Sequence, residues 1–173
     1  MPVRSSFRIQ KNRKLNNSLS RIIVGQIDTA TDLCKLPATN AEYAIHEIRK
    51  TMKRLRAVLR LTRFAIGEDK FNDENSRLRE ICFLFTDLRK SAAHLSSFSA
   101  IAEYDVFKNH PQLVTEIKNF LIKKKEEEYR KLSYKKNAMG KVMQLISGLK
   151  TRELFVEGKM DNISLDVLLL GLR

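Results

Sequence analysis

The chain has 173 residues, 43% of them hydrophobic, and its 33 Lys and Arg exceed its 20 Asp and Glu by 13. This length and composition predict a folded domain with a real core and exclude a disordered chain. The charge balance favours a polyanionic partner, such as nucleic acid, a polyphosphate or an anionic membrane surface, although a basic protein without such a partner has the same balance.

Few glycines and prolines (6 and 3) and a lack of strand-like alternation predict an all-α protein. A loose basic tail is expected over residues 1–12. Helices are then expected over 13–36, 41–66, 73–107 and 111–136, followed by a helical stretch over 141–149, a loop over 157–162 and a last helix to the chain end. Long helices with short connections predict an antiparallel four-helix bundle within a single domain over 1–173.

The second of these helices carries the strongest pattern in the chain. Its apolar residues fall within an arc of about 80° on a helical wheel; they are Ile45, Ile48, Met52, Leu55 and Leu59, with Ile66. Basic residues fill the other side, and Glu47 is the one acid between Ile45 and Phe64. A row of like charges repels itself unless counter-charge is supplied, which favours a polyanionic ligand.

Spacing along the basic face suits a linear anion. Residues three, four and seven apart on a helix are neighbours about 5–6 Å apart between Cβ atoms, so Arg49, Lys53, Arg56 and Arg60 can contact successive phosphates. Arg gives two parallel N–H bonds to a phosphate, and Lys acts as a point charge. We expect His46, at the centre of the cationic arc, to donate a hydrogen bond to phosphate. The alternative is a solvated basic face.

The same helix resembles a known family signature. Residues 43–61 read YAIHEIRKTMKRLRAVLRL and resemble the His-x-x-Arg and basic-block pattern of the CHAD family, the conserved histidine α-helical domains. His46 and Arg49 match its histidine and first arginine, and the block over 53–56 matches the rest. The third helix resembles the family's Leu-Arg-Asp element, with Arg89 at its arginine and Lys90 in place of its aspartate.

The resemblance implies a fold and a ligand. Such domains resemble two related helical bundles around a basic channel, and the match covers only the N-terminal half of one; no second histidine motif follows. This chain would then be half of a pseudo-symmetric domain, with a second helical bundle or a homo-oligomer completing the channel. The family is implied to bind inorganic polyphosphate and to sit on polyphosphate granules.

The sequence therefore predicts a non-catalytic polyphosphate-binding module. We found no phosphate-binding glycine loop, no nucleotide-binding glycine turn, no catalytic serine triad spacing and no metal-ligand spacing, so neither an enzyme nor a cofactor is expected. The predicted binding residues are His46, Arg49, Lys50, Lys53, Arg54, Arg56, Arg60 and Arg89. Two alternatives remain: a helical protein that binds the nucleic-acid backbone, and a scaffold that docks an acidic protein.

The cysteine content and the apolar segments of the chain bear on its expected cellular location. Cys34 and Cys82 are its only cysteines, which predicts buried thiols in a reducing compartment and argues against a disulfide scaffold. No run of about 18 apolar residues occurs, and the first residues lack an apolar signal core. We expect a cytoplasmic protein without a membrane partner, and the CHAD resemblance implies a location on polyphosphate granules.

Overall fold

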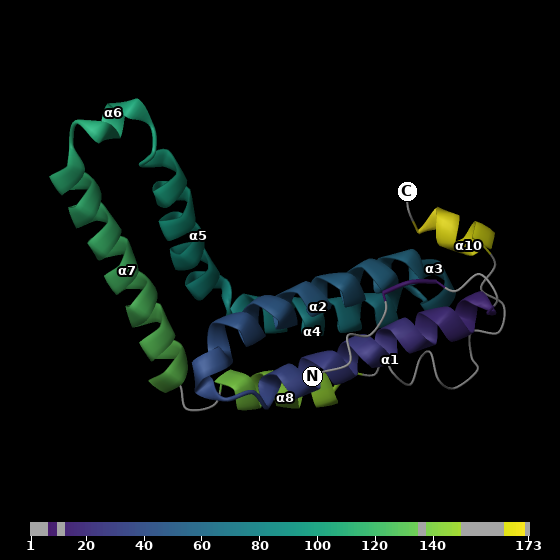
Figure 1. The fold of residues 1–173 in the computed structure, drawn as a ribbon. Coiled ribbons are helices and arrows are strands. Elements are labelled where there is room, and N and C mark those ends of the chain that lie inside the picture. Colours follow the sequence, from purple (N-terminus) through teal and green to yellow (C-terminus); the bar gives the residue numbers. More distant parts are fainter. Residues whose placement is uncertain (1–6, 10–12, 135–137, 150–164, 172–173) are drawn as a thin grey trace. The chain divides into compact units, whose positions relative to one another are not determined.

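The computed structural model describes residues 7–9, 13–134, 138–149 and 165–171, and every regular element in these ranges is a helix (Figure 1). The all-α prediction is confirmed. In chain order the elements are α1 (Leu15–Cys34), the 3₁₀ helix η1 (Ala38–Asn40), α2 (Ala41–Leu61), α3 (Arg63–Ile66), α4 (Glu68–Leu84), α5 (Thr86–Ile101), α6 (Asp105–Lys108), α7 (Pro111–Tyr134), α8 (Ala138–Ser147) and α10 (Leu165–Leu170).

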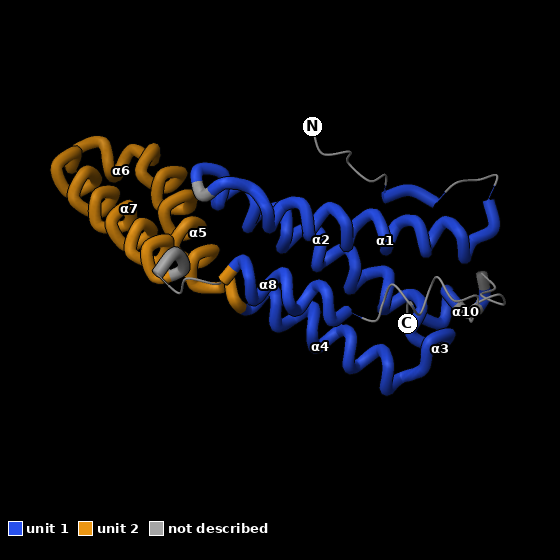
Figure 2. Tube along the Cα trace, turned by 90° about the horizontal axis from the view of Figure 1, so that it is seen from below, with its two compact units in different colours: residues 1–83, 139–173 blue, residues 84–138 orange. Residues whose placement is uncertain are grey.

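The chain forms two compact units (Figure 2). The first unit comprises residues 1–83 and 139–173, and the second comprises residues 84–138. The prediction that residues 1–173 make one domain stays a prediction, because each unit is described by itself. Most of the predicted tail over 1–12, the loop over 157–162 and the start of the last helix lie outside the described residues.

Helices α1 and α2 lie side by side and antiparallel in the first unit (Figures 1 and 2). The predicted apolar face of α2 is confirmed, since Ile48, Met52, Leu55 and Leu59 are fully buried. The buried face is wider than predicted because it also includes Ala44, Thr51 and Val58. Burying a Leu or Ile side chain contributes about 1.5–3 kcal/mol, so this face fixes which side of α2 remains available to a ligand.

Helices α4 and α8 complete an antiparallel four-helix arrangement with α1 and α2. Arg77 Nη1 of α4 donates to the carbonyl oxygen of Gly148, just after α8, at 2.8 Å. Lys141 Nζ lies 3.6 Å from Glu80 Oε1. The sequence predicted the helix over 111–136 as the fourth member of the bundle; that detail is wrong, because α8 takes this place and α7 belongs to the second unit.

The predicted continuous helix over 73–107 is also wrong, since it is divided into α4, α5 and α6. Phe85, between α4 and α5, is fully buried and has φ −107° and ψ 13°, outside the helical range. No glycine or proline marks this break. Its cause is tertiary, because the burial of Phe85 and a contact of the Cys82 carbonyl with α2 override the local helical preference.

The C-terminal end of α2 follows the sequence more closely. The buried Thr62 interrupts the helix, and its hydroxyl donates to the carbonyl oxygen of Val58 at 3.0 Å. One further turn, α3, leads to Gly67, whose φ of +87° belongs to the region that favours glycine. The predicted helix over 41–66 therefore has its expected end at Ile66, but Thr62 divides it into α2 and α3.

The second unit is a helical hairpin in which α5 and α7 run antiparallel and α6 joins them (Figure 1). Leu88 and Ser91 are its buried residues on α5. At the α6 end, the rings of Phe98 and Phe107 meet edge to face, with centroids 6.3 Å apart. Helix α7 corresponds to the predicted helix over 111–136, and its described part ends at Tyr134.

Gly171, directly after α10, lies against the end of α2. A Cβ atom at this position would stand 2.5 Å from the Leu61 carbonyl oxygen and 2.7 Å from that of Arg60. We expect Gly171→Ala to lower the free energy of unfolding by about 1–3 kcal/mol, since backbone atoms cannot give way as a side chain can. Urea denaturation measures this. The control is Gly148→Ala, whose nearest contact is the flexible Arg77 side chain at 3.4 Å; equal losses for both variants would contradict the prediction.

Candidate functional site

The basic residues of α2 lie on two flanks, one on each side of the buried face of the helix. On the flank toward α4 stand Arg49, Lys53, Arg56 and Arg60, which we call the seam row. From Arg49 to Arg60 the helix rises about 16 Å. On the other flank are Lys50 and Arg54, and His46 stands between the two flanks. The seam row is thus a continuous line of positive charge along one edge of the helix.

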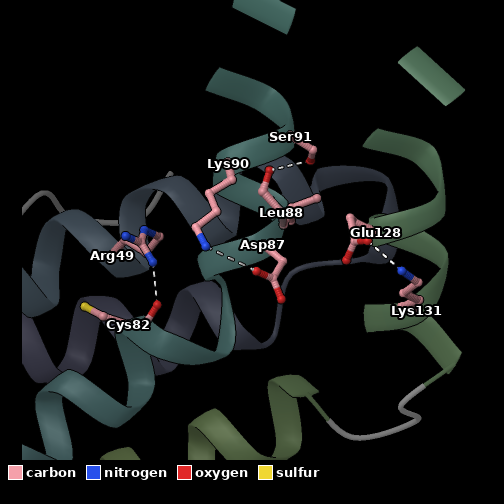
Figure 3. Close-up of polar contacts among 8 residues, drawn as sticks. All are labelled: Arg49, Cys82, Asp87, Leu88, Lys90, Ser91, Glu128 and Lys131. Carbon is pink, nitrogen blue, oxygen red and sulfur yellow. Dashed lines mark hydrogen bonds and ion pairs between the residues drawn. The ribbon is translucent and has the colours of Figure 1, made fainter. Parts of the chain in front are cut away.

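Helix α4 holds the first and third members of the seam row. Arg49 Nη1 donates to the carbonyl oxygen of Cys82 (Figure 3), and Arg56 Nε donates to Asn75 Oδ1 at 2.9 Å. Cys82 lies in the last turn of α4, where the helix dipole favours a cation. The partners run in opposite order along the two helices, so α2 and α4 are antiparallel. Both guanidinium groups are therefore oriented before any ligand arrives.

The other two members of the seam row, Lys53 and Arg60, are exposed. Within the described ranges, Lys53, Arg56 and Arg60 form no ion pair with a carboxylate. Their mutual repulsion is left to solvent and to counterions, which is the arrangement that an anionic ligand can exploit.

The opposite flank is partly neutralised by the protein itself. Glu47 Oε1 lies 3.1 Å from Lys50 Nζ and 3.9 Å from His46 Nε2. The Arg54 guanidinium stands over the Phe7 ring, 5.6 Å from its centroid. His46 itself is open to solvent, with 76% of its side chain exposed. Lys50 and Arg54 are accordingly less available to a ligand than the seam row.

The pKa of the Cys82 thiol is influenced by the charges of the seam row. Burial raises its pKa, and the nearby charges of Arg49, Arg56 and Lys53 oppose that rise. For comparison, burial raises the pKa of Cys34 on α1 to about 11. Three members of the seam row therefore act together on one point of α4. The prediction of buried thiols is confirmed for Cys34, whereas Cys82 is only half-buried.

The eighth predicted residue, Arg89, lies on α5 in the second unit and is exposed. Next to it, Lys90 Nζ lies 3.9 Å from Asp87 Oδ1 (Figure 3). The structure brings the seven candidates of α2 onto one helix, and the participation of Arg89 stays a prediction.

The model of the CHAD domain family matches residues 31–137. The chain belongs to the CHAD family. The match includes all of α2 and α4, so the seam row lies within it. CHAD domains are associated with polyphosphate binding in general. Comparison with curated proteins and with solved structures gave no match.

Two features of this CHAD domain were not apparent in the sequence. Asn75 and the Cys82 carbonyl orient the arginines of the seam row, but nothing in the local pattern of α4 distinguishes them from other solvent-side positions. Arg49 and Arg56 are seven residues apart, and so are Asn75 and Cys82. This matching spacing could have predicted the two contacts, but only if the pairing of α2 with α4 had been known.

Two absences concern the described part of this CHAD chain. In residues 7–9, 13–134, 138–149 and 165–171, no cluster of three or more His, Cys, Asp or Glu side chains is placed to hold a metal ion. Over the same ranges, none of the helices combines the length and apolar character needed to cross a bilayer.

Proposed function

We propose that this CHAD chain binds inorganic polyphosphate along the seam row and catalyses no reaction on it. The observation that carries the proposal is the line of four cations on α2, two of which are held in place by α4. A linear condensed phosphate presents anionic oxygens along its whole length. It can therefore occupy successive members of the row with charge-assisted hydrogen bonds.

Preorganisation supports a ligand-binding role for the clamped arginines. A free arginine side chain loses rotamer freedom when it binds, at a cost of about 0.5–1.5 kcal/mol. The Nε bond to Asn75 already restricts the Arg56 side chain, so Arg56 loses less rotamer freedom on binding. Its terminal N–H groups make no described ion pair and can therefore contact a phosphate. The exposed Lys53 lies between Arg49 and Arg56, and the exposed Arg60 lies beyond them, so these two residues add further positive charge to the row.

The remaining candidates take secondary roles in this proposal. His46 donates a hydrogen bond from the edge of the row. Lys50, Arg54 and Arg89 add long-range attraction to the polyanion. We further propose that a second helical bundle or another copy of the chain completes a basic channel, and that polyphosphate granules present the ligand in the cell.

A competition titration tests the proposal against nucleic-acid binding. Labelled polyphosphate is bound to the chain and then displaced by unlabelled polyphosphate, duplex DNA or single-stranded DNA, at matched phosphate and salt concentration. We expect polyphosphate to compete best, because its charge density matches the closely spaced row. Stronger competition by either nucleic acid would reject the proposal, and retained capture of an acidic protein without polyphosphate binding would favour a scaffold.

Cys82 provides an internal probe of where the ligand lies. A polyanion on the seam row would oppose the cations that lower the pKa of this thiol, and would so reduce its reactive thiolate. We expect saturating polyphosphate to slow the alkylation of Cys82 by about threefold. Mass spectrometry of timed iodoacetamide reactions measures both thiols, and Cys34, on α1, serves as the control. Equal rates at Cys82 with and without ligand would place the ligand elsewhere.

A further inference from the structure

The outward face of α4 carries an exposed aromatic ring that is not part of the core of the first unit. Phe83 is 76% exposed, although burying such a side chain would gain about 1.5–3 kcal/mol. It lines a shallow depression that is open to solvent, together with Ser76, Arg79 and Glu80. Other aromatic rings are exposed on or beside α2, namely those of Phe7, Tyr43 and Phe64. Two of them already carry a guanidinium: Arg63 lies over the Phe64 ring at 4.7 Å, and Arg54 over the Phe7 ring at 5.6 Å.

Along α4, Phe83 stands at the level of the Arg49 end of the seam row. Arg49, the first member of the row, contacts the carbonyl of Cys82, the residue before Phe83. Arg79 stands one turn before Phe83 on the same side of α4, and residues four apart on a helix are neighbours about 5–6 Å apart. Arg79 is exposed and, among the described residues, forms no ion pair. Positive charge therefore continues from the seam row to the edge of an available aromatic face.

We propose that the Arg49 end of the seam binds nucleoside polyphosphates, with the base stacked on Phe83. The phosphate chain follows Arg79, Arg49 and Lys53, so this inference rests on the proposed polyphosphate function. Because the depression is shallow, the base is held mainly through one π-face. Stacking of this kind tolerates any base, so adenine and guanine nucleotides bind alike.

Polar groups in the depression provide a secondary contact with the sugar or base. The Ser76 hydroxyl can donate or accept a hydrogen bond, and Glu80, which lies 3.6 Å from Lys141, can accept one. Neither group is buried, so neither enforces base identity. The aromatic ring supplies most of the preference for a nucleotide over a bare phosphate chain.

The test compares ATP with inorganic tripolyphosphate by isothermal titration calorimetry at fixed salt without divalent ions. ATP carries the same number of phosphates and no more charge, so tighter binding of ATP must come from the nucleoside. We expect ATP to bind about tenfold more tightly, which corresponds to one stacked base. Phe83→Ala should remove this advantage and leave the tripolyphosphate affinity unchanged, while Phe83→Trp should keep it.

Phe120→Ala on α7 is the matched control, since Phe120 is also exposed (63%) and also has a cation nearby, Lys124 in place of Arg79. Circular dichroism confirms that each variant stays folded. Equal affinities of the unaltered chain for both ligands, or equal losses for both in Phe83→Ala, would overturn the inference while the polyphosphate proposal stands. Failure of the chain to bind tripolyphosphate and longer chains would overturn both. Tighter binding of single-stranded DNA than of ATP at matched nucleotide concentration would assign the surface to nucleic acid and overturn the inference.

Discussion

Reversing the two exposed charges of the seam row, with Lys53→Glu and Arg60→Glu together, should lower polyphosphate affinity by about 100-fold. A hydrogen bond to a charged group contributes about 1.5–3 kcal/mol, so the loss of two such contacts alone accounts for that factor. The new carboxylates would also attract Arg49 and Arg56 and compete with the ligand for them. Titration of labelled polyphosphate at fixed salt measures the effect.

A control of equal charge separates the seam row from net charge. Lys118 and Lys123 lie on α7 and are both exposed, so Lys118→Glu with Lys123→Glu changes the net charge by the same amount. We expect this pair to weaken binding by less than about fivefold, through long-range attraction only. Equal losses in the two double variants would mean that the whole basic surface, rather than the row on α2, attracts the ligand.

The position of the basic face could be predicted from the sequence because a helix imposes its own periodicity. The buried residues Ile48, Met52, Leu55 and Leu59 determine which face of α2 packs on the core. The cations then have to lie on the opposite side. The width of the buried face was less predictable. Thr51 and Val58 are buried because neighbouring helices cover them, which depends on packing and not on their own pattern.

The division of that face into two flanks could not be predicted, because it depends on partners far along the chain. Arg49 meets Cys82, 33 residues away, and Arg56 meets Asn75, 19 residues away. The break at Phe85 has the same origin, since no local signal opposes a continuous helix there. Long-range contacts of this kind are set by the tertiary arrangement and override local propensity.

The same contacts explain why the seam row, and not the opposite flank, is the better candidate for a ligand. Glu47 neutralises Lys50 locally, and Phe7 covers Arg54, so these cations gain less from a new anion. Arg49 and Arg56 instead have neutral partners, a carbonyl and an amide, which orient a guanidinium without cancelling its charge. Orientation without neutralisation is what an anion-binding surface needs.

Polyphosphate affinity should fall about 50-fold between 50 mM and 200 mM salt, because each neutralised charge releases a counterion. The estimate takes the four cations of the seam row and a slope of about −0.7 per charge, the value for single-stranded polyanions. Titrations at several salt concentrations give the slope directly. A ligand too short to span the row from Arg49 to Arg60 engages fewer cations, so tripolyphosphate should give a shallower slope than a long chain.

The variants identify which charges contribute to that slope. Lys53→Glu with Arg60→Glu removes two members of the row, so its slope should be shallower by about 1.4. Asn75→Ala removes no charge: it should weaken binding by freeing Arg56, yet leave the slope unchanged. The comparison of these two slopes distinguishes Asn75, which positions a cation, from the cations that bind phosphate directly. A slope near zero for the unaltered chain would contradict an electrostatic site, and an undiminished slope in the double variant would place the contacts away from the seam row.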